Sequence, residues 1–297
     1  MDPLPIQKIK CIFGYFHACL CIGDKPERRI TFRRFSQGAF RDTDWSNNAT
    51  AMMTQTDVDN GLTHIEDVCD KLDGLCWEVD FANSAIGGGV LGRGQVQEEI
   101  RFLQCPELIV CKLFMENLAP HEGLKIVGYK QFNVTTGYRS TFLWDRIKRL
   151  EPRHSRRMIV MDALNYGAPD QQYRQFFRLN VHRELNKARV SFTTGDDLPI
   201  STGHWGCGAF GGNKELKAVI QMLAAGMTGK KLHYCTLGDN YLEINDLAAA
   251  VQGKRVSDVY NLLLQSINAL SAITLQTEAQ ITNFFTVFRQ RCRALRN

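Results

Sequence analysis

The sequence has 297 residues, of which 44% are hydrophobic and 23% are charged, and its formal net charge is +5. This composition excludes a disordered or fibrous chain, because it supplies enough apolar residues for a substantial buried core. The small positive charge is compatible with a polyanionic partner but does not identify one.

The first feature along the chain is an apolar and aromatic segment at residues 6–16, and a polar stretch at residues 42–60 follows it. The polar stretch is rich in Thr, Asn and Asp, which predicts a boundary or a long loop. Beyond it, strand-like apolar runs alternate with helix-like segments. The strand-like runs are residues 75–81, 124–127, 158–161, 190–192 and 231–236. This alternation predicts an α/β domain with helices packed on both faces of its sheet.

Two helices in the second half have clear start or stop signals. Asn213 can cap a helix whose apolar residues share one face, and Gly226 and Gly229 are expected to end it. Another helix is predicted to start at Ser257 or Asp258.

A strand, a glycine loop and a helix start are predicted between residues 79 and 102. Gly87, Gly88 and Gly89 follow the strand, and such glycines let a bulky ligand approach the main chain closely. Glu98 and Glu99 then begin the helix. A purely structural interpretation is that acidic residues at this position interact favourably with the helix dipole. Their place directly after a ligand-admitting loop favours a catalytic role instead.

The same loop also matches the GxGxxG pattern of dinucleotide-binding sites through Gly87, Gly89 and Gly92. In such a site the pyrophosphate lies on the following helix N-terminus. Here Glu98 and Glu99 occupy that position and would repel it, so this alternative is disfavoured.

A second glycine loop spans residues 202–212, immediately before the helix capped by Asn213. Successive backbone N–H groups at such a position can bind an anion, and no acidic residue opposes a diphosphate here. Two alternatives stay open. The loop could be a crowded turn that packs Trp205 and Phe210, or Cys207 could be a nucleophile with His204 as its base. We favour His204 as part of the lining of a ligand groove.

Ten cysteines are scattered without a CxxC pair, so we predict no metal site. The sequence shows neither a secretory signal nor a run of about 18 apolar residues that could cross a membrane. We therefore expect reduced thiols in a nuclear or cytoplasmic protein.

These motifs together resemble the poly(ADP-ribose) glycohydrolase family, whose signature is three glycines followed after a short spacer by Gln-Glu-Glu. Here Gly87–Gly89 precede Gln97, Glu98 and Glu99. The resemblance extends from about residue 6 to about residue 242, with further blocks at residues 136–138 and 183–188.

The resemblance implies a three-layer α/β/α macrodomain with a mixed central sheet and flanking helical segments. It implies an N-terminal segment at 1–60 that is a remnant of a helical accessory region, a catalytic core at 61–250, and C-terminal helices at 251–297. The implied activity is hydrolysis of the ribose–ribose bonds of poly(ADP-ribose), releasing ADP-ribose without a cofactor.

The resemblance also implies residue roles. Glu99 would be the catalytic acid and later the base, Glu98 and Asn83 would hold the ribose, and Asp80 would support the site. Tyr138 would stack on adenine. Further substrate contacts are implied for Gly87, Gly88, Gly89, Gln97, His204, Gly206, Cys207, Gly208, Ala209, Phe210 and Gly211, of which residues 206–211 belong to the diphosphate loop.

Two positions depart from the family pattern: His204 stands where asparagine is usual, and Leu237 where an aromatic residue is usual. Adjacent helical residues point about 100° apart, so Glu98 and Glu99 are not expected to share one role or to form a covalent glycosyl enzyme.

Two other functions compete with this hypothesis: a reader that binds ADP-ribose without cleaving it, and a hydrolase of single ADP-ribose units on proteins. The expected partners are poly(ADP-ribose) and poly(ADP-ribosyl)ated proteins in the DNA damage response. We expect a monomer that needs neither nucleic acid nor a membrane.

Overall fold

The computed structural model describes residues 3–22, 28–38, 40–149, 155–271 and 277–295. The chain forms two compact units. Unit 1 comprises residues 1–35, 79–119 and 123–162, and unit 2 comprises residues 36–78, 120–122 and 163–297. In the described ranges, no helix is both long and apolar enough to cross a membrane. The division at residues 60 and 250 stays a prediction.

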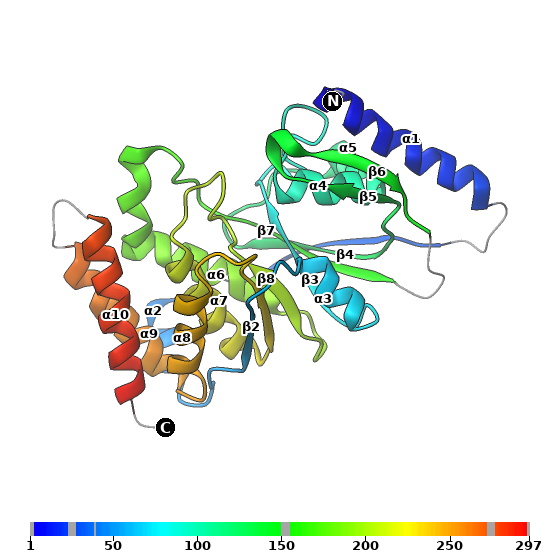
Figure 1. Cartoon of the computed structure of the whole chain (residues 1–297). Coiled ribbons are helices and arrows are strands. Elements are labelled where there is room, and N and C mark those ends of the chain that lie inside the picture. Colours follow the sequence, from blue (N-terminus) through cyan, green and yellow to red (C-terminus); the bar gives the residue numbers. More distant parts are fainter. Residues whose placement is uncertain (1–2, 23–27, 39, 150–154, 272–276, 296–297) are drawn as a thin grey trace. The chain divides into compact units, whose positions relative to one another are not determined.

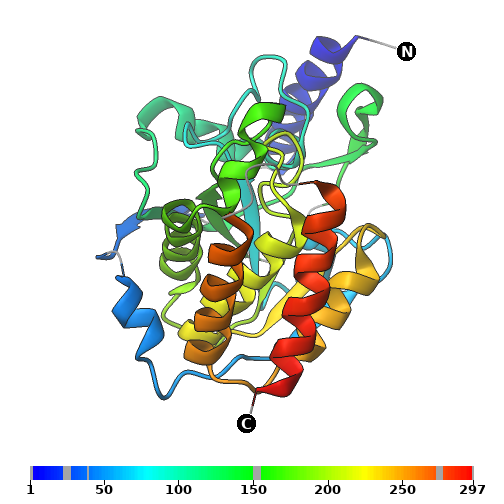
Figure 2. The same cartoon turned by 90° about the vertical axis from the view of Figure 1, so that its left-hand side faces the viewer.

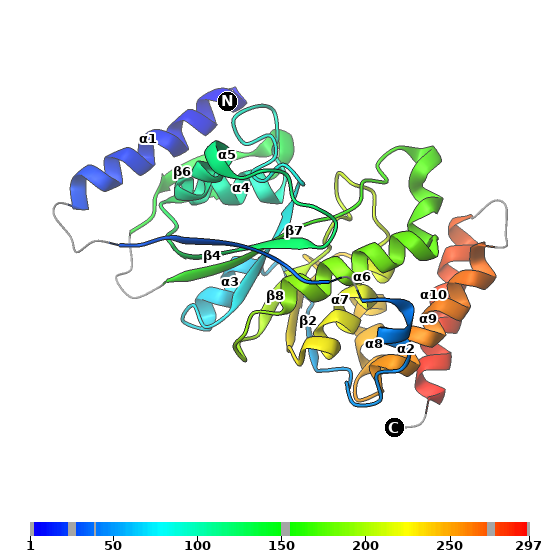
Figure 3. The same ribbon diagram turned by 180° about the vertical axis from the view of Figure 1, so that it is seen from behind.

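Unit 1 contains α1 (Leu4–Ile22), β1 (Thr31–Ser36), most of β3 (Trp77–Ala82), α4 (Gln97–Gln104), η1 (Pro106–Val110), α5 (Cys111–Phe114), β4 (Glu122–Tyr129), β5 (Asn133–Thr136), η2 (Arg139–Thr141), β6 (Leu143–Ile147) and β7 (Arg156–Asp162). Its sheet strands lie in the order β1-β4-β7-β3, and β5 and β6 form a separate pair. Figure 1 shows α1 alongside β6, and Figure 3 shows β1 beside β4.

The core of unit 1 fixes α4 against its sheet. Phe102 and Leu103 of α4 are buried in one cluster with Leu124 and Ile126 of β4. Each fully buried side chain of this type stabilises the fold by about 1.5–3 kcal/mol, so the start of α4 is held on a rigid base. The polar residues at that start are thereby given fixed positions.

Unit 2 contains α2 (Asp42–Ser46), β2 (Thr56–Asp59), α3 (Ile65–Lys71), the first residues of β3, η3 (Pro169–Phe176), α6 (Arg178–Phe192), β8 (Ile200–Gly203), α7 (Lys214–Thr228), β9 (Leu232–Cys235), α8 (Tyr241–Val251), α9 (Val256–Ser271) and α10 (Glu278–Ala294). Its strands are parallel, with β8 between β3 and β9 and with β2 beyond β9. Figure 2 shows α10 running beside α8.

Four of the five predicted strand runs are confirmed as β3, β4, β7 and β9. The prediction of a strand at residues 190–192 is wrong, because those residues end α6. Val181, Leu185, Ala188 and Phe192 of that helix are all buried at helical spacing. A run of three apolar residues is too short to distinguish a strand from the buried face of a helix.

Helix α7 confirms its predicted cap. The side chain of Asn213 accepts a 2.9 Å hydrogen bond from the backbone N–H of Leu216, and Gly229 ends the helix with a φ of 69°. Gly226 does not end it but lies inside it, where a Cβ would stand 2.8 Å from the carbonyl oxygen of Met52. Close packing, not helix termination, explains that glycine. The other predicted helix, α9, begins at Val256, just before the expected start.

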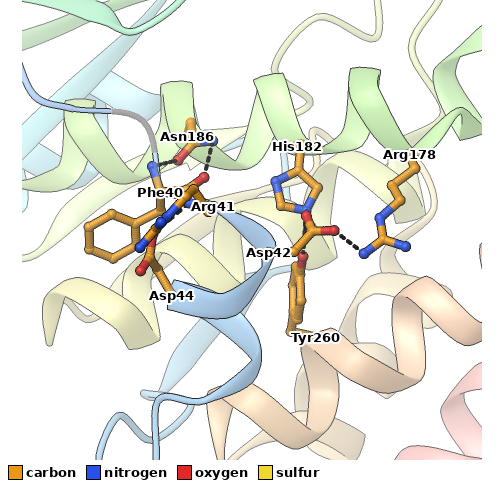
Figure 4. Close-up of polar contacts among 8 residues, drawn as sticks. All are labelled: Phe40, Arg41, Asp42, Asp44, Arg178, His182, Asn186 and Tyr260. Carbon is orange, nitrogen blue, oxygen red and sulfur yellow. Dashed lines mark hydrogen bonds and ion pairs between the residues drawn. The ribbon is translucent and has the colours of Figure 1, made fainter.

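The polar stretch at residues 42–60 is not one long loop, because it contains α2 and the edge strand β2. Figure 4 shows how α2 is fixed within unit 2. Asp42 forms an ion pair with Arg178 of α6, contacts the His182 ring of the same helix and accepts a hydrogen bond from Tyr260 of α9. Burial lowers the pKa of His182 to about 4, and the positive charge of Arg178 adds to the effect. Such side-chain contacts leave no apolar pattern in the sequence.

Candidate active site

The first three residues of α4 each attach the helix to the strand and loop that precede it. The side chain of Gln97 accepts a 2.8 Å hydrogen bond from the N–H of Phe81 and donates a 3.1 Å bond to the carbonyl oxygen of Val79. It therefore bonds to β3 as a neighbouring strand would. Its role is to orient the helix start.

Glu98 is 2% exposed, and both of its carboxylate oxygens accept hydrogen bonds from backbone N–H groups. Oε2 accepts from Asn83 at 3.0 Å, and Oε1 accepts from Gly87 at 2.7 Å. Burial raises the pKa of Glu98 to about 8, against the two N–H donors and the charge of Lys112, while the charge of Glu99 adds to the rise. Glu98 thus anchors the start of the glycine loop through the backbone of Asn83 and Gly87.

Glu99 is 5% exposed, and its carboxylate contacts a later part of the same loop. Its Oε1 accepts a 2.9 Å hydrogen bond from the N–H of Gly89, and its Oε2 accepts a 2.9 Å bond from the N–H of Val96. Each carboxylate oxygen has a second lone-pair site that can carry a proton. The two adjacent glutamates therefore contact different parts of the loop, as their helical spacing predicts.

Glycine is required in this loop because the glutamates lie so close to it. A Cβ on Gly88 would stand 2.5 Å from Oε1 of Glu99 and 2.7 Å from Oε2 of Glu98. The φ angles of Gly87 and Gly88, 83° and 42°, are also in the region that favours glycine. Contact with the carboxylates thus explains Gly88, whereas a Cβ on Gly89 would stand 2.8 Å from the backbone nitrogen of Gly94.

Asp80 lies in β3, and Asn83 directly follows the end of that strand. The side chain of Asn83 accepts a 3.0 Å bond from the N–H of Ala85 and shapes the turn into the loop. Asp80 is fully buried. Burial raises the pKa of the Cys111 thiol to about 12, and the nearby charge of Asp80 adds to that rise.

Two lysines that the sequence did not single out donate to the carbonyl groups of the same loop. Nζ of Lys8, in α1, contacts four of them, and Nζ of Lys112, in α5, donates to Gly88 at 2.9 Å. The loop is therefore held by carboxylates on its N–H groups and by ammonium groups on its carbonyls. No local motif marks either lysine, because each lies in a separate helix.

Tyr138 belongs to unit 1 and is 45% exposed. Its turn is anchored by a 3.0 Å bond from the N–H of Arg139 to the carbonyl oxygen of Gln95. Burial raises the pKa of Tyr138, with the charge of Arg139 opposing and that of Glu99 adding to the rise. The structure thus brings Tyr138 near Glu99, while its role on adenine stays a prediction.

The second glycine loop lies in unit 2, between β8 and α7. The N–H of Gly212 donates to the carbonyl of Gly206, which folds the loop back on itself, and the N–H of Tyr166 donates to the carbonyl of Phe210 from outside the loop. Within the part of the chain that the structure describes, the N–H groups of Gly208, Ala209 and Phe210 have no hydrogen-bond acceptor. Three consecutive unpaired N–H groups before a helix start form a site suited to an anion.

Trp205 is fully buried, as one alternative for this loop expected, but Gly208 and Ala209 are exposed. The loop therefore combines a packed base with an accessible tip. Its base includes Lys217, which pairs with Glu184 and lies 4.0 Å above the Trp205 ring. The crowded turn and the anion site are not exclusive.

Among the described residues, the surroundings of Cys207 favour its protonated thiol, because burial outweighs the charge of Lys214. Burial raises the pKa of its thiol well above the ordinary range, and its Sγ lies 3.5 Å from the carbonyl oxygen of Trp205. The ring nitrogens of His204 contact Tyr234 at 3.2 Å and the carbonyl of Asp239 at 3.1 Å. Burial lowers the pKa of His204, although the bond to Asp239 opposes this. The hypothesis of a Cys207–His204 pair is therefore not supported.

Leu237, the second departure from the family pattern, is 46% exposed and has a φ of 52°. That conformation is unusual for a bulky side chain. Among the described residues, no group of three or more His, Cys, Asp or Glu side chains is arranged to hold a metal ion.

Comparison with known proteins identifies one family. A sequence model described as "Poly (ADP-ribose) glycohydrolase (PARG), Macro domain fold" matches residues 43–244. The chain is 34% identical to poly(ADP-ribose) glycohydrolase 1 of Caenorhabditis elegans over 89% of its own length and 35% of that protein. It is also 34% identical to poly(ADP-ribose) glycohydrolase 2 of that organism, over 80% of its own length and 51% of that protein. The chain thus spans about a third to a half of these relatives.

Some solved structures are also similar to the chain. A poly(ADP-ribose) glycohydrolase from Deinococcus radiodurans in complex with ADP-ribose is 16% identical, with a TM-score of 0.46, over 70% of this chain and 88% of that one. The α/β macrodomain expected from the sequence is confirmed by the family model, and the mixed strand directions of the sheet agree with it.

Proposed function

The chain belongs to the poly(ADP-ribose) glycohydrolase family, and we propose that it hydrolyses the ribose–ribose O-glycosidic bonds of poly(ADP-ribose) and releases ADP-ribose. The observation that carries this proposal is the attachment of the Glu99 carboxylate to the glycine loop. Two backbone N–H groups fix it, at Gly89 and Val96, on a helix with a buried base. A reader without catalysis has no need for a carboxyl group held in this way.

In the proposed reaction, Glu99 donates a proton to the departing ribose oxygen as the glycosidic bond breaks. The electron pair of that bond leaves with the oxygen, and the sugar carbon develops oxocarbenium character. Glu99, now a carboxylate, then accepts a proton from the attacking water. The proton count closes, because the carboxyl group ends the cycle as it began.

Glu98 is suited to holding the site together rather than to attacking the sugar. Both of its oxygens already accept hydrogen bonds from Asn83 and Gly87. The pKa of Glu98, raised by burial to about 8, keeps much of this carboxyl group protonated near neutral pH, and a protonated carboxyl group is a weak nucleophile. We therefore propose no covalent glycosyl intermediate, and a glycosyl-Glu98 adduct detected by mass spectrometry would overturn this assignment.

The loop at residues 206–212 is proposed to bind the diphosphate of ADP-ribose. Its three unpaired N–H groups and the absence of acidic residues support this assignment. Binding of this kind uses the backbone, so it depends on the loop's shape more than on its side chains.

The test is release of ADP-ribose from purified poly(ADP-ribose), comparing the native protein with Glu99→Gln and with Glu116→Gln as a matched control. Glu116 is exposed in unit 1 and lies outside the loop. We expect Glu99→Gln to lose at least about 10²-fold in rate, the contribution of a general acid, and Glu116→Gln to keep the native rate.

Binding of ADP-ribose, measured by calorimetry, separates the alternatives. A native protein that binds polymer without cleaving it would be a reader. Release only from proteins that carry single units would indicate a mono-ADP-ribosyl hydrolase. Equal rates for native protein and Glu99→Gln would remove Glu99 from the role of acid.

We further propose poly(ADP-ribosyl)ated proteins as partners and a role in the DNA damage response in the nucleus or cytoplasm. The proposed state is a monomer that needs no nucleic acid or membrane. Light scattering of the purified protein tests whether it is a monomer. Imaging of the tagged protein before and after DNA damage tests its location.

A further inference from the structure

Lys8 lies in α1, and its ammonium group is directed at the glycine loop more than eighty residues later. Only 6% of the residue is exposed. Nζ donates to the carbonyl oxygens of Gly89 at 3.1 Å, Val90 at 3.0 Å, Gly92 at 2.9 Å and Gly94 at 2.6 Å. Four acceptors thus surround three protons, so the loop's carbonyl groups converge on a single cation.

The same loop residues connect Lys8 to Glu99. Gly89 donates its N–H to Oε1 of Glu99 and offers its carbonyl to Lys8. Two residues beyond Gly94, the last carbonyl that Lys8 contacts, Val96 donates its N–H to Oε2 of Glu99. The segment from 89 to 96 is therefore bonded to the carboxylate at both ends and to the ammonium between them.

We propose that Lys8 is a positioning residue for the glycosidic reaction: its ammonium group fixes the loop at residues 89–94 and thereby the Glu99 carboxyl group. This inference rests on the function proposed above. Lys8 precedes residues 43–244, which the family model matches, so α1 contributes to the site from outside the matched segment.

The geometry requires lysine rather than arginine. An ammonium group is compact and directs its protons tetrahedrally, whereas a guanidinium group is planar and wider. Four carbonyl oxygens within 3.1 Å of one nitrogen leave no room for the wider group. Lys8→Arg should therefore fail to replace Lys8, although it retains the charge.

A purely structural role for Lys8, as an anchor for α1, makes a different prediction. Loss of an anchor would lower stability and the fraction of folded enzyme, but the enzyme that remains folded would keep its native kcat. Loss of a positioning contact lowers kcat in the enzyme that remains folded and leaves KM little changed, because a displacement of about 1 Å at a catalytic group can cost about 10²-fold.

The experiment compares native protein, Lys8→Met, Lys8→Arg and Lys10→Met, a matched control on the same helix. The kinetic readouts are kcat and KM on purified poly(ADP-ribose), corrected for the folded fraction by circular dichroism. Hydrogen exchange of the amides at residues 87–96 reports the order of the loop. We expect kcat to fall by about 10²-fold in both Lys8 variants, with faster exchange in the loop, and no such change in Lys10→Met.

A native kcat in folded Lys8→Met, restoration of kcat by Lys8→Arg, or unchanged exchange in the loop would each overturn the proposal. If Lys8→Met does not fold, Lys8→Arg decides alone, since it retains the charge and the apolar stem. If the native protein cleaves no polymer, the proposed function fails; hydrogen exchange then still tests the contact between Lys8 and the loop.

Discussion

Oε1 of Glu98 accepts a 2.7 Å hydrogen bond from the backbone N–H of Gly87, so the helix start and the glycine loop are joined through a buried carboxyl group. The bond favours the ionised carboxylate, whereas burial favours the protonated form. Burial has the larger effect, and it raises the pKa of Glu98 from 4.5 to about 8.

This raised pKa predicts a pH-dependent stability. Between pH 4.5 and about pH 8 the folded protein retains a proton on Glu98 that the unfolded chain releases, so the free energy of unfolding falls as pH rises through this range. The stabilisation is fully present below pH 4.5 and is lost above pH 8. Urea unfolding from pH 5 to pH 8.5 measures it. Glu98→Gln cannot titrate and should show a flatter dependence; identical slopes would contradict the assignment.

Gly88→Ala should impair catalysis more than stability. The added methyl group would meet the carboxylate oxygens of both glutamates, and the φ of 42° disfavours alanine. We expect about a 10²-fold loss of rate on poly(ADP-ribose), because the carboxyl groups must move. Gly38→Ala is the matched control, since a Cβ there meets nothing within 4 Å. Native activity in folded Gly88→Ala would show that the loop tolerates the displacement.

The buried pair of Lys217 and Glu184 should support the loop at residues 206–212. Their side chains are 1% and 3% exposed. Lys217→Met leaves a buried carboxylate without this partner, and we expect a loss of about 3 kcal/mol in the free energy of unfolding. Lys214→Met is the control, because its pair with Asp239 is exposed and should contribute under about 1 kcal/mol.

A double variant, Lys217→Met with Glu184→Gln, tests the same pair further. Removing both charges should cost less than removing the lysine alone, since the buried carboxylate that would keep only Arg183 as an ionic partner is then gone. Urea unfolding of the native protein, Lys217→Met, Lys214→Met and the double variant gives the comparison. A double variant that is less stable than Lys217→Met would rule out the buried charge as the cause.

Cys207 should react slowly with alkylating reagents. Its thiol has a raised pKa and stays protonated, whereas Cys19 and Cys21 are exposed on α1. Iodoacetamide at pH 8, followed by peptide mass spectrometry at early times, should find label on Cys19 and Cys21 first. Preferential labelling of Cys207 would revive its interpretation as an activated nucleophile.

Local sequence predicted the elements around the site well. The strand before Asn83, the glycine loop and the helix start at Gln97 are present as expected, and Asn213 caps α7. These features depend on short-range rules: glycine at positive φ, apolar periodicity and side-chain capping. The same rules failed at residues 190–192, where the run was too short to fix a period.

The sequence by itself determined the family, the α/β class and the two loops that carry the proposed chemistry, because each of these is predicted by short contiguous stretches of residues. Only the tertiary structure decided what holds those loops. Nζ of Lys8, in α1, donates to the carbonyl oxygen of Gly94 in the glycine loop. Lys217 of α7 forms an ion pair with Glu184 of α6. Contacts between residues far apart in the chain have no fixed spacing, so they exist only once the packing of the core has brought their helices together.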